Sequence, residues 1–209
     1  MTSSSEDIQK HQTQTLRHNL RIKRRQLSKI KQYQHSQRIS QRIVQSDTYK
    51  YARHIAVYLA ADGEVDLSFL ISKMHQQGKK CYLPVITSRQ EGLIGFAPYE
   101  THTRLTKNCF AILEPIYQKK QIKTAKQMDI VLAPLVAFDN QGNRMGMGGG
   151  YYDRALKHLK TATIKPKFIG IAHELQRVSE LQVHSWDIAL NAIVTEHCFE
   201  FFNSTAQTM

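Results

Sequence analysis

At 209 residues, the chain is long enough for one well-buried α/β domain and short for two, so we expect a single domain over residues 1–209. Apolar runs fall well short of the roughly 20 residues needed to cross a bilayer, and the polar N-terminus lacks the apolar segment of a secretory signal. Three widely spaced cysteines form no C-x-x-C pair, which is typical of a reducing compartment. We therefore expect a cytoplasmic protein with no membrane partner.

The formal net charge of +12 is concentrated in residues 1–54, which carry 12 Lys and Arg against three Asp and Glu. Three interpretations compete: a nucleic-acid-binding surface, a solvated helical face, or a positive field around an anionic ligand. Recognition of bases or single strands would bring interleaved aromatic residues, but residues 1–48 contain only Tyr33. We therefore expect no specific nucleic-acid partner and favour the field around a ligand.

Residues about 8–46 predict a basic helical arm, formed by two helices or by one bent helix. Ser28 is a suitable N-cap for the second of them. An apolar stripe at helical spacing is formed by Leu16, Leu20, Leu27 and Ile30.

Short apolar runs rich in β-forming residues predict buried strands at 54–60, 80–85, 129–138, 167–172 and 192–195, with shorter strands at 93–99 and 110–113. Pro84 is expected to end the second strand. Helices are predicted from Leu67 to Gly78 and over 151–159, residues 118–127 are expected to be an exposed loop, and the tail at about 203–209 to be frayed. Strand, helix and strand in succession predict a three-layer α/β domain with a mostly parallel sheet.

In such sheets, ligands bind beyond the carboxyl ends of the strands. Glu64, the stretch 144–153 and His173 each follow a predicted strand, so we expect them to converge on one edge of the sheet. We assign no catalytic role to His173, because a histidine in such a position is more often a satisfied polar residue than a catalyst.

The most informative stretch is Asn143–Arg154, which contains four glycines between an apolar strand and a predicted helix. Glycines let backbone N–H groups approach an anion closely, Arg144 and Arg154 add permanent charge, and Asp153 adds a carboxylate suited to a metal bound to phosphate. The stretch matches neither the dinucleotide fingerprint nor the P-loop. Physics alone therefore leaves two alternatives open: a nucleotide polyphosphate site, or a tight turn without a ligand.

The order of motifs along the chain is more specific than this composition. The central one comprises Pro134–Asp139, Gly142-x-Arg144-Met145-Gly146 and Gly148–Arg154, and shorter matches are Tyr58–Asp66, Gly78–Val85, Gly170–His173 and Trp186-Asp187. Over roughly residues 14 to 200, the chain closely resembles the 5-formyltetrahydrofolate cyclo-ligase family (methenyltetrahydrofolate synthetases). The resemblance implies a sheet like that of ribose-phosphate-isomerase and coenzyme-A-transferase folds.

The resemblance also implies a reaction, in which ATP and 5-formyltetrahydrofolate give 5,10-methenyltetrahydrofolate, ADP and phosphate through a phosphorylated formyl group. Phosphoryl transfer relies on positioning and charge stabilisation, so no protein nucleophile is expected. The alternative is a relative that keeps ATP binding but acts on another formamide-bearing or carboxylate substrate. A monomer is expected.

By the same resemblance, the residues that bind ATP are Arg17, Arg144, Met145, Gly146, Met147, Gly148, Gly149, Gly150, Tyr151 and Tyr152. Those implied for the folate are Arg17, Leu59, Glu64, Met147, Gly148, Gly149, Gly150 and Tyr151. Asp153 and Asp187 are implied as ligands of Mg²⁺.

Several of these residues have simpler explanations. Asp153 could be an acidic residue near a helix start, Asp187 a surface carboxylate and Glu64 a solvated or capping residue. We expect Trp186 to be a packing anchor, and one of the two adjacent tyrosines to face the core. The chain departs from the family at Thr13, where a basic residue is common, and at Met147, where many members have a basic residue or tyrosine.

Overall fold

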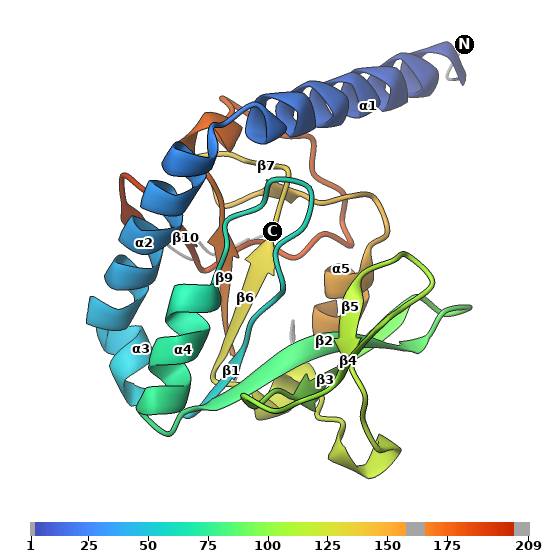
Figure 1. The fold of residues 1–209 in the computed structure, drawn as a ribbon. Coiled ribbons are helices and arrows are strands. Elements are labelled where there is room, and N and C mark those ends of the chain that lie inside the picture. Colours follow the sequence, from blue (N-terminus) through green and yellow to red (C-terminus); the bar gives the residue numbers. More distant parts are fainter. Residues whose placement is uncertain (1–2, 158–165, 203–209) are drawn as a thin grey trace.

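A computed structural model describes residues 3–157 and 166–202 and centres on a seven-stranded sheet with the order β11-β10-β9-β6-β1-β2-β3 (Figure 1). The inner strands run parallel to one another, and the edge strands β3 and β11 are antiparallel to their neighbours. The strand bounds are β1 His54–Ala56, β2 Lys80–Ser88, β3 Leu93–Pro98, β6 Ile130–Pro134, β9 Lys167–Ile171, β10 Ala192–Val194 and β11 Phe199–Phe201. The predicted α/β class with a mostly parallel sheet is confirmed.

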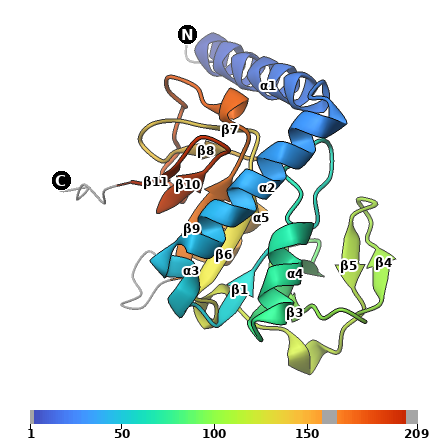
Figure 2. The ribbon, with the colours of Figure 1, turned by 60° about the vertical axis from the view of Figure 1, so that its left-hand side comes forward.

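Helices cover both faces of this sheet, which gives three layers. Helices α2 (Lys29–Gln45), α3 (Asp47–Tyr51) and α4 (Ser68–Gln76) lie on one face, and α5 (Tyr151–Leu156) lies on the other (Figures 1 and 2). Helix α1 (Ser3–Arg25) crosses the end of the sheet toward which the β6 arrow points. Within the described residues, no helix is long and apolar enough to cross a membrane.

The two faces are built by alternation along the strands, because successive side chains of a strand point to opposite sides. Ile130 and Leu132 of β6 join a buried cluster with α2 and α4, whereas Val131 and Ala133 join the cluster that contains Leu156 of α5. Both faces of β6 are therefore covered, as expected for a continuous apolar run in a parallel sheet.

The basic arm is two helices, as one of the two alternatives had it. Helix α1 ends at Arg25. Ser28 then caps α2 by accepting a hydrogen bond from the Lys31 backbone N–H (3.3 Å). The expected apolar stripe is wrong at Ile30, whose side chain is 70% exposed. The stripe assumed one helical direction, and the start of α2 does not continue the apolar face of α1. Leu20 is buried as predicted.

Pro84 lies inside β2, so the expectation that it ends the strand is wrong. Its partner in β3 is Phe96, whose backbone groups bond Lys123 on the far side (2.9 Å each way) instead of β2. On the other side of β2, the ladder with β1 ends at Tyr82. A backbone N–H at position 84 would thus have no ladder partner, which is where proline is tolerated in a sheet.

The strand predicted at 110–113 is wrong for residues 110–112, which form the tip of a hairpin, and only Leu113 lies in a strand. Strands β4 (Leu105–Lys107) and β5 (Leu113–Pro115) pair on either side of the tip. The Asn108 side-chain oxygen accepts hydrogen bonds from the backbone N–H groups of Phe110 (2.9 Å) and Ile112 (3.1 Å). This side chain takes the place of a strand partner and closes the turn.

Other boundaries move by a few residues. The run at 129–138 divides into β6 and a short strand β7 (Ala137–Phe138), which pairs with β8 (Arg144–Met145). Strand β1 ends at Ala56 instead of residue 60. The stretch at 118–127 contains the 3₁₀ turns η1 (Lys119–Gln121) and η2 (Ala125–Gln127). The end of the helix predicted to 159 and the tail at 203–209 lie outside the described residues.

Candidate functional site

The glycine-rich stretch forms an exposed loop between β8 and α5, at the edge of the sheet where the parallel strands end. Its base is the tight β7–β8 hairpin, held by the fully buried side chain of Asp139. That carboxylate accepts hydrogen bonds from the backbone of Gln141 (2.9 Å), Asn143 (3.0 Å) and Leu181 (3.1 Å). A fixed hairpin thus presents a loop whose residues 147–149 are exposed.

Two glycines of the loop adopt backbone angles that other residues rarely take. Gly148 has φ +95°, and Gly150, which begins α5, has φ +63°. Gly149 is confined in another way, because a Cβ there would lie 2.9 Å from the ring of Tyr151. The glycines are therefore required by the loop's conformation, which leaves its exposed backbone free of side-chain atoms.

Arginines from distant segments hold both sides of the loop. Arg17 of α1 donates from Nε to the Gly146 carbonyl (3.0 Å), and its guanidinium carbon lies 3.8 Å from where a Cβ of Gly148 would be. Burial lowers the pKa of Arg17, and the charge of Arg21 lowers it further. Arg154 donates to the carbonyls of Gly92 (2.8 Å) and Gly149. The structure thus brings Arg17 to the loop, as expected.

Arg144 and Asp153 form an ion pair within the site (2.6 Å), and the Arg144 guanidinium lies over the ring of Phe168 (5.0 Å). Burial lowers the pKa of Arg144, against the opposing charges of Asp153 and Asp187. The two aspartates therefore act on the same guanidinium. Asp153 Oδ1 also accepts from the Ile188 backbone N–H (3.2 Å), and Asp187 Oδ2 accepts from that of His184 (2.8 Å).

This pair of carboxylates suits Mg²⁺. Each ionised carboxylate has about four lone-pair positions, so the hydrogen bonds at one oxygen of each aspartate leave ligand capacity for a cation. Mg²⁺ binds through one or two carboxylates and completes its shell with water and phosphate oxygens. The charge and type of these two side chains therefore match that ion, next to a loop suited to phosphates.

Trp186 is 61% exposed, so the expectation that it anchors packing is wrong. Its ring stacks on His184, with centroids 4.6 Å apart and an interplanar angle of 14°. Core contacts in this segment come instead from Leu181 and Leu190, which are buried on either side of it. The two adjacent tyrosines divide as expected: Tyr152 stacks on Phe168 in the core cluster around α5, whereas Tyr151 meets the hairpin tip.

Glu64 lies at the turn that follows β1. Its Oε2 accepts from the Ala61 backbone N–H (3.0 Å), and its Oε1 lies 3.9 Å from Arg24. Burial raises the pKa of Glu64. Burial also raises the pKa of Tyr152, and the charge of Glu64 adds to that rise, so these residues from two segments are close. Leu59 packs against the core under α2 and α4, and its substrate contact stays a prediction.

Arg24 is an essential part of this arrangement that sequence reasoning missed. Its side chain is only 1% exposed and donates to Asp62 Oδ2 (3.0 Å), to the Asp62 carbonyl (2.9 Å) and to the Leu135 carbonyl (3.1 Å). Asp62 also accepts from Arg21 (2.7 Å). The spacing of Arg17, Arg21 and Arg24, by four and then three residues, places all three on one helix face, and this was the available signal.

Phe110 is a second missed residue. It is 49% exposed at the tip of the β4–β5 hairpin, and its ring meets that of Tyr151 edge-on, with centroids 6.1 Å apart. Arg89 lies over its other side (6.0 Å). The hairpin therefore supplies an apolar wall beside the loop, which the sequence did not indicate because this stretch read as a strand.

The convergence predicted from topology is confirmed for all three segments. Glu64 follows β1, the loop follows β6 by way of β7 and β8, and His173 follows β9. His173 is fully buried, and its Nε2 lies 3.2 Å from the Gly63 carbonyl. Basic, acidic and backbone N–H groups thus meet at one edge of the sheet, a combination that can bind a polyphosphate with its metal beside a second ligand.

Comparison with known proteins gives matches to a single family. A model of the 5-formyltetrahydrofolate cyclo-ligase family matches residues 9–196. The chain is 36% identical to the 5-formyltetrahydrofolate cyclo-ligase of Escherichia coli K12 over 176 residues, which cover 84% of this chain and 96% of that protein. It is 34% identical to the protein of that name from Haemophilus influenzae, over 85% of this chain and 94% of that one.

Solved structures show the same likeness. The 5,10-methenyltetrahydrofolate synthetase of Aquifex aeolicus superposes with a TM-score of 0.78 at 27% identity, covering 94% of this chain and 96% of that one. The 5,10-methenyltetrahydrofolate synthetase of Mycoplasma pneumoniae gives a TM-score of 0.69 at 26% identity, covering 88% and 98% of the two chains.

Proposed function

Because the chain belongs to the 5-formyltetrahydrofolate cyclo-ligase family, we propose that it converts 5-formyltetrahydrofolate to 5,10-methenyltetrahydrofolate with ATP and Mg²⁺. The observation that supports this most is the glycine loop, held between Arg17 and Arg154 and flanked by the Arg144–Asp153 pair. It offers an exposed backbone and positive charge at the same end of the sheet as the carboxyl group of Glu64, whose charge acts on Tyr152 of α5.

The chemical difficulty of the reaction is the formyl oxygen, which is a poor leaving group. We propose that the oxygen attacks the γ-phosphorus of ATP and displaces ADP, giving an imidate-like phosphate ester. The second folate nitrogen then attacks the formyl carbon and closes the five-membered ring. The C–O bond breaks, the oxygen leaves as part of phosphate, and the attacking nitrogen loses its proton, which the departing phosphate can accept. Each step needs alignment and charge stabilisation more than a protein nucleophile.

On the nucleotide side, the backbone from Gly146 to Gly150 is proposed to bind the phosphates, with Arg17 and Arg144 compensating their charge. Arg17 is already fixed to the loop by its bond to Gly146, so little ordering remains for binding. Met147 is 53% exposed on the loop, and its side chain adds no charge. Asp153 and Asp187 would hold Mg²⁺, which would neutralise charge on the transferred phosphoryl group when bound.

On the folate side, we propose that Glu64 accepts hydrogen bonds from the amino-pyrimidine edge of the pterin. The salt-bridged turn Asp62–Glu64 keeps that carboxyl group in place. Leu59, Tyr151 and the hairpin tip at Phe110 would supply apolar surface for the rings.

Isotope transfer tests the phosphorylated intermediate directly. The substrate is 5-formyltetrahydrofolate labelled with a heavy oxygen isotope in its formyl group, and the products are analysed by mass spectrometry. The proposal requires the label in the released phosphate after a single turnover. Label appearing in water, with unlabelled phosphate, would rule out phosphoryl transfer to the formyl oxygen.

A further inference from the structure

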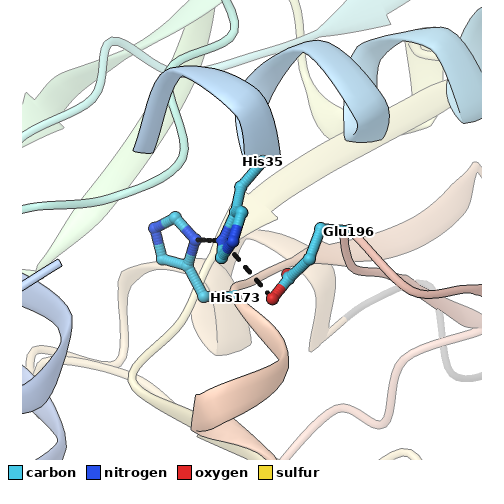
Figure 3. Close-up of side chains that lie close together, drawn as sticks. All are labelled: His35, His173 and Glu196. Carbon is cyan, nitrogen blue, oxygen red and sulfur yellow. Dashed lines mark hydrogen bonds and ion pairs between the residues drawn. The ribbon is translucent and has the colours of Figure 1, made fainter. Parts of the chain in front are cut away.

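Three metal-ligating side chains from separate elements meet under helix α2, on residues to which the proposed reaction gives no role. Figure 3 shows His35 of α2 between His173, which follows β9, and Glu196, which follows β10. His35 Nδ1 lies 3.0 Å from His173 Nδ1 and 3.3 Å from Glu196 Oε1. One donor atom from each of the three residues lies within 4.8 Å of the other two, close enough for all three to bind a single ion.

The outer contacts of the cluster orient its donor atoms inward. His173 Nε2 lies 3.2 Å from the Gly63 carbonyl, which can only accept, so the ring hydrogen is on Nε2 and Nδ1 carries a free lone pair toward His35. Glu196 Oε2 accepts from the Glu174 backbone N–H (3.0 Å), which leaves Oε1 toward His35. Such bonds from the far side of a ligand to backbone groups are typical of metal sites.

The carboxylate of this cluster is buried. The side chain of Glu196 is only 6% exposed, and its ion-pair partners among the described residues are the histidines His35 and His197. Arg42 donates to the backbone oxygen of Glu196 (3.3 Å) instead of its carboxylate. A buried carboxylate is costly without a partner charge, and a bound cation would supply one.

We propose that His35, His173 and Glu196 form a binding site for a divalent transition metal, and that Zn²⁺ suits the donor set best. Two imidazoles and one carboxylate are ligands that zinc accepts in tetrahedral sites, with water in the fourth position. Mg²⁺ prefers oxygen ligands, so this site differs in chemistry from the aspartate pair. His35, at 16% side-chain exposure, provides the route of entry.

The proposed ion would connect helix α2 to the ends of β9 and β10 and, through His173, to the turn at Gly63. Its role is therefore to fix the position of the turn that carries Glu64. The site stands independently of the folate reaction, because none of its three ligands belongs to the proposed ATP or folate sites.

Cobalt titration tests the site, because Co²⁺ replaces Zn²⁺ and gives visible absorption bands when tetrahedral. Metal-free full-length protein, without ATP, is titrated with Co²⁺ and then with Zn²⁺. We expect one equivalent of Co²⁺ to give tetrahedral bands, which Zn²⁺ removes. His35→Gln should weaken binding by at least about 100-fold. The matched control is His75→Gln, a half-buried histidine of α4 that bonds the Tyr99 carbonyl (3.0 Å), and it should leave the bands unchanged.

Two results would overturn the proposal. Wild-type protein that gives no stoichiometric tetrahedral spectrum has no such site, and His35 then simply donates a hydrogen bond to His173. A spectrum that survives in His35→Gln but disappears in Asp153→Asn assigns the cobalt to the aspartate pair. Glu196→Gln provides a second ligand variant if His35→Gln does not fold, as judged by circular dichroism.

Discussion

Asp153 makes a structural ion pair and has a proposed role in metal binding, and a single substitution removes both. Its carboxylate balances the buried Arg144 guanidinium (2.6 Å) and is a proposed ligand of Mg²⁺. The amide of asparagine keeps the shape but loses the charge. Because a buried charge without its partner is costly, the site would lose both metal affinity and the alignment of Arg144.

We expect Asp153→Asn to lower kcat/KM by at least about 100-fold, and a large excess of Mg²⁺ to restore part of the loss. Steady-state rates over a range of Mg²⁺ concentrations measure this. Asp47→Asn is the control, since the ion-pair partner of Asp47 among the described residues is Lys50 on the surface, and this variant should behave as wild type. An Asp153→Asn enzyme with the Mg²⁺ dependence of the wild type would remove Asp153 from the metal site.

Two glycines with the same backbone angle allow strain to be distinguished from function. Gly150 (φ +63°) lies in the loop, and Gly78 (φ +67°) ends helix α4 with no atom within 4 Å of the place where a Cβ would lie. Alanine at either position should lower the free energy of unfolding by about 1–2 kcal/mol. Only Gly150→Ala should also raise the KM for ATP, because its methyl group would lie 2.9 Å from Arg154. Denaturant unfolding measures the free energies, and steady-state kinetics measure the KM for ATP. The same KM for ATP in Gly150→Ala and Gly78→Ala would count against the loop as the phosphate site.

Among the elements, α1 is attached to the sheet through a buried charged side chain, Arg24, in addition to the apolar contact of Leu20. Arg24 bonds the turn after β1 and the Leu135 carbonyl after β6, so it joins the arm to two strand ends. Arg17, on the same face of the helix, reaches the loop. The basic arm is therefore part of the site's framework, which agrees with a positive field around an anionic ligand.

Arg24→Met should destabilise the protein by about 3–5 kcal/mol, because Asp62 and the Leu135 carbonyl lose a buried partner. Arg25→Met is the matched control. Arg25 is 48% exposed and lies 3.5 Å from the same Asp62, so its loss should cost less than about 1 kcal/mol. The urea midpoints of the two variants measure this difference in stability. Similar midpoints would show that the buried Arg24 contributes no more to stability than the exposed Arg25.

The sequence predicts those elements whose signal is local. Apolar runs indicated the central strands, and the Ser28 cap indicated the break between α1 and α2. Pro84 and the 110–113 hairpin were misjudged because the outcome depends on partners: whether a strand lies beside Pro84, and whether Asn108 supplies the bonds that a neighbouring strand would. Arg24 was missed for the same reason, since its partners come from residues 62 and 135. The loop was found from its own glycines and flanking charges, whereas Arg17 was found through the family resemblance, which carries such long-range information.

For the molecule as a whole, His173 makes stability depend on pH. Burial lowers its pKa from 6.5 to about 4 in the folded protein. As the pH falls below 6.5, the unfolded chain binds the proton and the folded protein does not, so folding stability decreases until about pH 4. The loss should approach about 3 kcal/mol for the metal-free protein.

Urea unfolding in buffers containing a chelator, from pH 7 to pH 4, measures this loss. His173→Gln should be less stable at pH 7 but should vary less with pH, because glutamine does not titrate. Parallel curves for the wild type and the variant would mean that other groups cause the acid sensitivity.

The most direct test of the proposed function is the growth of the methenyltetrahydrofolate absorbance band when purified protein is mixed with 5-formyltetrahydrofolate, ATP and Mg²⁺. The account predicts that the band appears, that it requires both ATP and Mg²⁺, and that one ADP forms for each methenyltetrahydrofolate. A folded protein that binds ATP but gives no band would contradict the folate reaction and indicate a ligase acting on another formamide or carboxylate.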